Sequence, residues 1–575
     1  MTVTQKRLMA GAAIVAAAAA TGLGAQNREW TTANGDAQRS SWVRTDARLT
    51  KDAVQKGEFK FLWKTRFAGE NRQLNSLTQP ILVDRLISHR GFKALAFVGT
   101  SSERIFAIDT DLNKIYWEHV INYSSIAPPA NSTGPCPGGL MASFTRPTIA
   151  APPAFGPGRG GGGRSGSSVG EPGRGAPSLQ AAQGRGRGND PVPPAAGRAN
   201  TPAAPAAPQG RAAPSPGNGG GPTENVFVLG ADGLVRALNT HNGSERFPAV
   251  PFLPANARPS ALILVDGVLY TTTANGCGGV PNGVYAVDIN ADEAKTVSWR
   301  TGGPSVAGAA GVAVGTDGTI YAATSESSEG GSAAGAKETM YASTVVALEP
   351  KTLKLKDWFT APGADFNASP TVVRHNNKDL VVITANDGRM YLLDGSSLGG
   401  GDHKTPLHVT AKYTAAGAMA GLSSWEDQGT RWVLAPAVGG PQAGMKLAAN
   451  GPAPNGNLVA FKLVDQGGKL ALEPAWASRD MTSPLTPVFF SGVVFAVSSG
   501  EHRAAAATKL TAAARAKASI PAVLYALDPA TGKELWNSGK SITSFAKGGL
   551  SASAGQVYLV TYDNTLYAFG IPMEH

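Results

Sequence analysis

Side chains whose types and spacing could do chemistry are few in this 575-residue chain. Its eight histidines are scattered without ligand spacing, and neither a nucleophilic triad nor a phosphate-binding glycine loop is present. The only two cysteines, Cys136 and Cys277, belong to no Cys-x-x-Cys-His motif, so no covalently attached haem is expected. No single motif therefore identifies an enzyme.

Cys136 and Cys277 both lie in glycine-rich stretches, GPCPGG and NGCGGV. In an oxidising compartment two thiols pair most simply as a disulfide. Two free thiols are the alternative, and a metal site built from two isolated cysteines is favoured less. The sequence predicts a disulfide between neighbouring repeats.

Residues 1–25 have the features of an export signal. The basic pair Lys6 and Arg7 precedes an apolar run, which small residues follow. That run is shorter than a membrane-spanning helix needs, and no cysteine follows it to accept a lipid. We expect a signal peptide over residues 1–25 and a mature periplasmic or secreted protein with no transmembrane segment.

The formal net charge of +10 is concentrated in one biased segment. Residues 151–222 are rich in Gly and Pro and hold seven arginines against two acidic residues. They show no apolar periodicity that would offset the entropy of ordering them. We expect a disordered insertion, tolerated by the fold, rather than an RNA-binding segment, so the charge does not indicate a nucleic-acid partner.

A strand–turn–strand repeat organises the rest of the chain. Its clearest copy is Val523–Trp536, VLYALDPATGKELW, in which apolar residues alternate, then turn through Asp-Pro-Ala-Thr-Gly and end at a tryptophan. Degraded copies begin near Ile105, Val235, Val284, Val345, Met390, Leu458 and Leu566. A four-stranded unit that recurs every few dozen residues is typical of a propeller.

The last copy lacks its final strand, and Phe59–Phe67, FKFLWKTRF, can supply it from the other end of the chain. Such closure removes both sheet edges. We predict an all-β, eight-bladed β-propeller of four-stranded antiparallel blades over residues 26–575, closed by an N-terminal strand.

Four insertions fall between the second and third strands of a repeat, which places them on one face of a propeller. They are Asn275–Asn282, Ser325–Ala342, Val438–Asn455 and Ser499–Pro521. The last of them has helix-favouring composition, so we expect a short helix over the central funnel. Loops on a rigid scaffold commonly form binding sites, and an envelope protein or small ligand is the expected partner there.

The form Ala-x-Asp-x-x-Thr-Gly-x-x-x-Trp of Ala526–Trp536, with the opening Trp30–Asp46, resembles the PQQ-like (quinoprotein alcohol dehydrogenase-like) β-propeller repeat family. Dehydrogenases of that family stack pyrroloquinoline quinone (PQQ) between a Trp and a disulfide of adjacent cysteines, beside a calcium or lanthanide ion. This chain has no adjacent cysteines, and it reads Leu77-Thr-Gln-Pro80 where the family has Glu before Pro.

The resemblance implies four site residues for a dehydrogenase. Asp365 and Glu349 are the candidates for catalysis, and Asn367 and Trp425 for cofactor binding. Glu349 also fits an ordinary turn, and Trp425 also fits packing between blades. No metal ligands are assigned.

Two functions follow. The first is a non-catalytic binding or scaffold protein of the cell envelope, similar to the family's outer-membrane assembly scaffold but without its lipid-attachment cysteine. The alternative is a PQQ-dependent dehydrogenase that oxidises an alcohol or sugar.

Overall fold

The computed structural model describes residues 29–44, 46, 48–72, 75–88, 91–125, 136–150, 224–326, 341–415, 417, 420–503 and 510–572. The expected signal peptide, residues 1–25, and the expected insertion, residues 151–222, lie outside them. All described residues belong to the compact unit formed by Met1–Pro152 and Gly220–His575, and the second unit, Pro153–Gly219, lies outside them.

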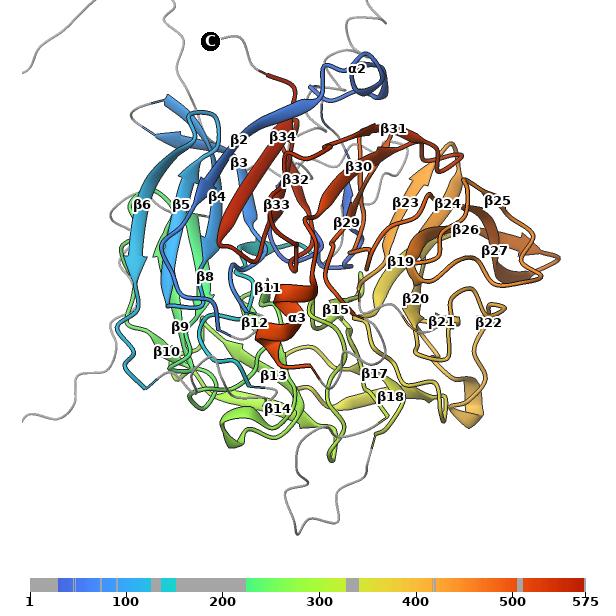
Figure 1. Cartoon of the computed structure of the whole chain (residues 1–575). Helices are drawn as coiled ribbons and strands as arrows, with labels where there is room; N and C mark the ends of the chain where they lie inside the picture. Colours follow the sequence, from blue (N-terminus) through green and yellow to red (C-terminus); the bar gives the residue numbers. More distant parts are fainter. Residues whose placement is uncertain are drawn as a thin grey trace, which may run out of the picture. The chain divides into compact units, whose positions relative to one another are not determined.

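The described strands form eight antiparallel sheets that follow one another around a ring in chain order (Figure 1). Blade 1 contains β3 (Ile81–Ser88), β4 (Gly91–Gly99), β5 (Arg104–Asp109) and β6 (Lys114–Val120), and blade 2 contains β8 (Asn225–Leu229), β9 (Leu234–Asn239) and β10 (Val250–Pro251). Blade 3 contains β11 (Ile263–Val265), β12 (Val268–Thr273), β13 (Gly283–Asp288) and β14 (Thr296–Arg300). Blade 4 contains β15 (Ala313–Val314), β16 (Ile320–Ala323), β17 (Thr344–Leu348) and β18 (Leu355–Thr360).

Blade 5 contains β19 (Thr371–His375), β20 (Lys378–Thr384), β21 (Met390–Asp394) and β22 (His408–Val409), and blade 6 contains β23 (Ser423–Asp427), β24 (Thr430–Val438), β26 (Gly456–Gln466) and β27 (Lys469–Ala477). Blade 7 contains β28 (Val488–Phe490), β29 (Val493–Ser498), β30 (Val523–Leu527) and β31 (Glu534–Asn537). Blade 8 contains β32 (Ser551–Ser553), β33 (Gln556–Val560), β34 (Thr565–Gly570) and β2 (Lys60–Arg66). The remaining described elements are β1 (Trp42–Val43), β7 (Pro147–Thr148), β25 (Ala448–Ala449), the helices α2 (Lys51–Gln55) and α3 (Ala512–Ala518), and the 3₁₀ turns η2 (Cys277–Gly279) and η3 (Gly400–Asp402).

The ring closes as the sequence predicts. Strand β2 pairs antiparallel with β34, from Lys60 opposite Gly570 to Arg66 opposite Thr565 (Figure 1). The eight-bladed propeller with its N-terminal closing strand is therefore confirmed. Blade 2 departs locally, because its first strand is reduced to one bridge between Thr145 and Phe227, and β7 instead pairs parallel with β11 of blade 3.

Recurring tryptophans dock one blade onto the next. The indole of Trp117 in blade 1 donates a hydrogen bond to the Thr240 carbonyl of blade 2 at 2.8 Å. Trp476 in blade 6 donates to the Pro529 carbonyl of blade 7 at 2.9 Å. A ring that packs and also satisfies its N–H contributes more than buried area alone. The repeat's Trp therefore joins neighbouring blades.

The N-terminal arm, which we define as Trp30–Arg48, runs along the inner strands of all eight blades. Backbone and side-chain hydrogen bonds join Trp30 to Leu82, Thr31 to Arg146, Thr32 to Leu262, Ala37 to Val314, Gln38 to Val372, Ser40 to Ser424, Ser41 to Phe489 and Asp46 to Gly555. These partners belong in turn to blades 1 to 8. The arm therefore lines the centre of the ring, a role that its sequence does not reveal.

Candidate functional site

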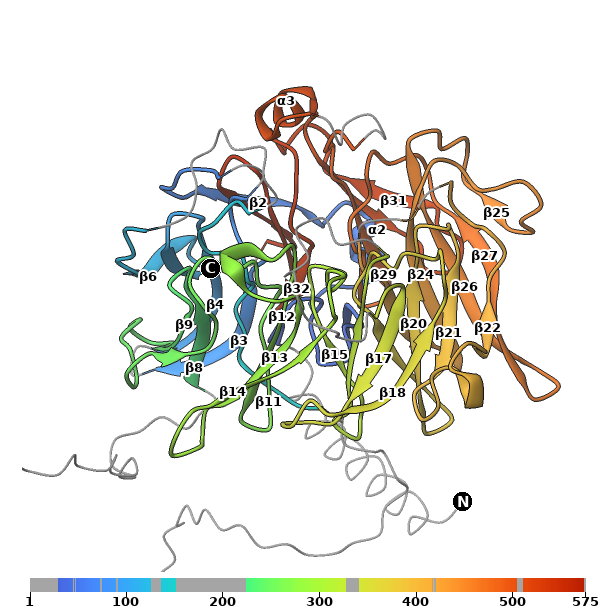
Figure 2. The same cartoon turned by 90° about the horizontal axis from the view of Figure 1, so that it is seen from below.

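The two faces of the ring differ in their connections. We call "loop face" the one that carries the connections between second and third strands and those between blades, and "turn face" the opposite one. The four predicted insertions do join second to third strands, in blades 3, 4, 6 and 7. Helix α3 forms in the last of them and projects from one face of the ring (Figure 2). Both expectations are confirmed for the described residues.

Asp365 and Asn367 lie together on the loop face, in the connection from blade 4 to blade 5. The Asp365 carboxylate accepts hydrogen bonds from the Glu326 amide at 2.8 Å and from the Asn386 side chain at 2.5 Å. Asn386 in turn accepts from Asn367 at 2.6 Å. Both Asp365 oxygens thus bind protein donors, and the network ties three loops together.

Glu349 lies elsewhere. It begins the turn between β17 and β18, where its carboxylate accepts a hydrogen bond from Thr352 at 2.9 Å. A turn between third and fourth strands belongs to the turn face, because successive antiparallel strands reverse direction. Asp365 and Glu349 are therefore on opposite faces and cannot act on one substrate.

Trp425 is fully buried in β23. Its ring lies parallel to two aromatic rings, that of Phe489 with centroids 4.7 Å apart and that of Trp432 at 5.9 Å, each with an interplanar angle of 5°. The Trp425 side chain has no solvent-exposed surface. In this position Trp425 packs blade 6 against blade 7 and offers no face to a cofactor.

We tested whether these residues fit the PQQ and metal centre that the fold implies. Among the described residues no group of three or more His, Cys, Asp or Glu side chains is placed to hold a metal ion. The Asp365 oxygens are engaged by protein donors, and Trp425 is enclosed. The residues brought together on the loop face do not fit that centre.

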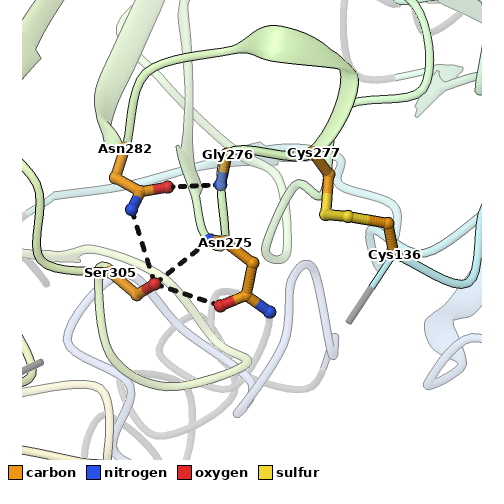
Figure 3. Close-up of a disulfide and its surroundings, with 6 residues drawn as sticks. All are labelled: Cys136, Asn275, Gly276, Cys277, Asn282 and Ser305. Carbon is orange, nitrogen blue, oxygen red and sulfur yellow. Dashed lines mark hydrogen bonds between the residues drawn. A yellow bond between two sulfur atoms is a disulfide. The ribbon is translucent and has the colours of Figure 1, made fainter. Parts of the chain in front are cut away.

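A disulfide joins Cys136, in the connection from blade 1 to blade 2, to Cys277 in blade 3 (Figure 3). The Cys277 loop is held in place by hydrogen bonds: the Gly276 amide donates to Asn282 at 3.0 Å, and the Asn275 amide donates to Ser305 at 3.1 Å (Figure 3). The disulfide predicted from the sequence is present. It fixes two loops of the loop face to each other.

A charge cluster on the loop face surrounds Glu501, whose side chain is fully buried. Three cations converge on it: Arg503 at 2.6 Å, Arg515 of α3 at 2.9 Å and Lys547 at 3.3 Å. Burial alone raises the pKa of Glu501, but the three cations outweigh it and lower that pKa to about 2. We call these four residues the Glu501 cluster. It carries two positive charges in excess.

A second buried glutamate has the opposite electrostatics. Glu103, 1% exposed, accepts hydrogen bonds from the Ala231 amide at 3.2 and 3.3 Å. Burial raises its pKa to about 7, because the amide and the cations Arg236 and Arg72 only partly compensate. Neither glutamate is marked by a sequence motif, because only tertiary packing removes the solvent around it.

These two glutamates predict opposite pH dependences of stability. Glu501, with a lowered pKa, stabilises the fold above pH 4.5, and that contribution is lost as the pH falls from 4.5 towards 2. Glu103, with a raised pKa, disfavours the fold increasingly as the pH rises from 4.5 through 7. Each effect should be on the order of 2–3 kcal/mol.

Unfolding midpoints of the E501Q and E103Q variants across pH 3–8 measure both effects. E501Q should lower stability at pH 7 and flatten its loss in acid, whereas E103Q should flatten the loss between pH 4.5 and 7. Parallel pH profiles for the three proteins would contradict the assignment.

Comparisons with known proteins found one matching family model and several solved structures of similar fold. Residues 475–571 match the family model described as outer membrane protein assembly factor BamB. No curated protein matches. Among solved structures, the chain is similar to the quinohemoprotein alcohol dehydrogenase from Comamonas testosteroni, with 14% identity, TM-score 0.53, and 96% of this chain and 82% of that one covered.

Two further structures are similar. A europium-containing methanol dehydrogenase has 11% identity and TM-score 0.54, with 96% of this chain and 99% of that one covered. BamB from Moraxella catarrhalis has 12% identity and TM-score 0.46, with coverage of 89% and 99%. At these identities the likeness shows the fold alone.

Proposed function

We propose that this chain, which carries the repeats of the PQQ-like β-propeller family, is a non-catalytic binding or scaffold protein of the cell envelope. Its loop face would take an acidic segment of a partner protein. The observation that carries the proposal is the Glu501 cluster, where three cations share one carboxylate.

The three cationic side chains of the Glu501 cluster have more N–H groups than the protein acceptors described around them. Arg503 uses its Nε on Glu501, Arg515 uses Nε on the His502 carbonyl and Nη2 on Glu501, and Lys547 contacts Glu501 through Nζ. The three cationic side chains remain 18%, 24% and 35% exposed. Partly buried cations whose other N–H groups lack a partner in the described part of the chain are suited to charge-assisted hydrogen bonds with incoming carboxylates. A flexible acidic segment would satisfy them.

The position of the cluster supports a macromolecular partner. Helix α3 projects from one face of the ring, near its centre (Figures 1 and 2). The partial exposure of the three cationic side chains makes the cluster accessible from solution. Complementary charge raises the association rate and fixes orientation, which suits docking onto a rigid scaffold. The export that such a role needs rests on residues 1–25, outside the described part of the chain.

The test is titration of a fluorescent decaglutamate peptide, with a neutral decapeptide as control, followed by anisotropy. We expect salt-sensitive binding that R503A and K547A each weaken about tenfold, a loss of roughly 1.4 kcal/mol. The matched control is K533A, which removes an exposed lysine of the turn face and should change the affinity less than twofold. Equal losses for K533A and K547A, or no peptide binding, would overturn the proposal.

The alternative is a dehydrogenase, because a quinohemoprotein alcohol dehydrogenase and a europium-containing methanol dehydrogenase share the fold. The network of Asp365 and Asn367 is the place on the loop face where that alternative can be tested. Titration with PQQ, with and without calcium or a light lanthanide, separates the two functions. Our proposal predicts no stoichiometric binding at micromolar concentrations. Metal-dependent binding that D365N abolishes would replace it with the dehydrogenase.

A further inference from the structure

A cavity of about 420 Å³ opens on the turn face, where the N-terminal arm meets blades 4 to 6. Trp42 and Arg44 of the arm form one wall. The first hairpin of blade 5 contributes Arg374, and that of blade 6 contributes Glu426 and Arg431. The volume lies in the range of small-molecule sites. We call it the arm cavity.

The arm cavity is cationic. It gathers three arginines against one acid, Glu426, which pairs with Arg431 at 2.6 Å. In the described part of the chain, the guanidinium groups of Arg44 and Arg374 have neither an ion pair nor a hydrogen bond to protein. Two arginines therefore line a shared space without ion-pair partners of their own among the described residues.

Packing holds these charges close together. The Arg44 guanidinium lies 4.1 Å from the centroid of the Trp42 ring and that of Arg431 lies 5.6 Å from it, so one indole contacts both cations. Arg431 is 11% exposed, and its Nε is buried without an acceptor among the described residues. A buried, unpaired N–H costs free energy until an acceptor reaches it.

Nearby acids do not neutralise the cavity. Asp379 lies opposite Arg374 in the β19–β20 pair, but one of its oxygens accepts from the Thr316 amide at 2.6 Å and from the Thr316 hydroxyl at 2.9 Å. Glu426 is 49% exposed, so solvent screens part of its charge. The lining itself keeps an excess of two positive charges, and the Asp379 carboxylate behind Thr316 reduces this excess without cancelling it.

We propose that the arm cavity binds a small organic dianion, a dicarboxylate or a phosphomonoester, between Arg44, Arg374 and Arg431. Planar guanidinium groups pair with the oxygens of carboxylate and phosphate in the same bidentate geometry. The site lies on the face opposite the Glu501 cluster. It therefore does not depend on the proposed partner, and the two can be tested separately.

The experiment is isothermal titration of the full mature chain with succinate and with glucose 6-phosphate. Succinamide and glucose are the uncharged controls. We expect saturable, stoichiometric binding of at least one dianion and none of its uncharged counterpart. Preference between the two probes identifies carboxylate or phosphate as the ligand chemistry.

Variants make the assignment specific. R374A and R44A should each weaken binding at least tenfold, and R66A, which removes an exposed arginine of β2, should leave it unchanged. Because Arg374 has no protein partner, its loss should leave the unfolding midpoint unchanged. The proposal is overturned if neither dianion binds at concentrations up to about 1 mM. It is also overturned if R66A weakens binding as much as R374A and R44A do.

Discussion

Replacing Arg39 with methionine should lower the free energy of unfolding by roughly 3–5 kcal/mol. Arg39 is fully buried at the centre of the ring. Its Nε donates to the Val312 carbonyl at 2.8 Å, and Nη1 donates to the Thr32 hydroxyl and the Ala33 carbonyl at 2.7 Å each. Burial lowers its pKa to about 9. Methionine would leave these acceptors buried and unpaired.

The matched control is R66M, since Arg66 is exposed on β2 and should change stability by no more than about 0.5 kcal/mol. Urea denaturation followed by tryptophan fluorescence compares the two variants. A loss for R39M as small as that for R66M would show that the arm contributes little to the ring.

Substituting Gly532 with alanine should destabilise the protein by about 3 kcal/mol. Gly532 closes the turn before β31 with φ of +70°, where an L side chain is already strained. A Cβ there would lie 2.3 Å from the Trp476 ring of the preceding blade. Because that ring is also held by its hydrogen bond to Pro529, neither side can move freely.

The control for this substitution is G467A, in the corresponding turn of blade 6. Gly467 has a similar φ of +64°, but a Cβ there would meet nothing within 4 Å. It should cost only the backbone strain, about 1 kcal/mol. The difference between the thermal unfolding midpoints of G532A and G467A measures the cost of the contact with the Trp476 ring. Equal midpoints would mean that the Trp476 ring moves aside to make room for the new Cβ.

The features that recur in every repeat could be predicted from the sequence. Alternating strands, the Asp-to-Gly turn at 528–532 and the recurring Trp specify a local unit, and counting units leads to eight blades with β2 as the closing strand. The same count placed the insertions on one face, and the composition of Ser499–Pro521 predicted a short helix there, where α3 forms. The pairing of Cys136 with Cys277 followed from having two thiols and no competitor.

The sequence did not show which candidate side chains would meet in the folded chain. The repeat pattern treats Glu349 and Asp365 as near neighbours in sequence, yet strand reversal puts them on opposite faces. Trp425 departs from the docking position, which suggested a stacking role, but Phe489 and Trp432 enclose it. A pattern of residue types does not say which side of a strand is covered.

The sequence by itself determined the ring, its closure, its elaborated face and its disulfide, because those features depend on period and number. Tertiary structure alone decided the path of the N-terminal arm, the three cations around Glu501 and the three arginines of the arm cavity. Each of these groups joins residues from different blades or from opposite ends of the chain. Their charges and burial arise only when the closed ring brings distant segments together and removes the water between them.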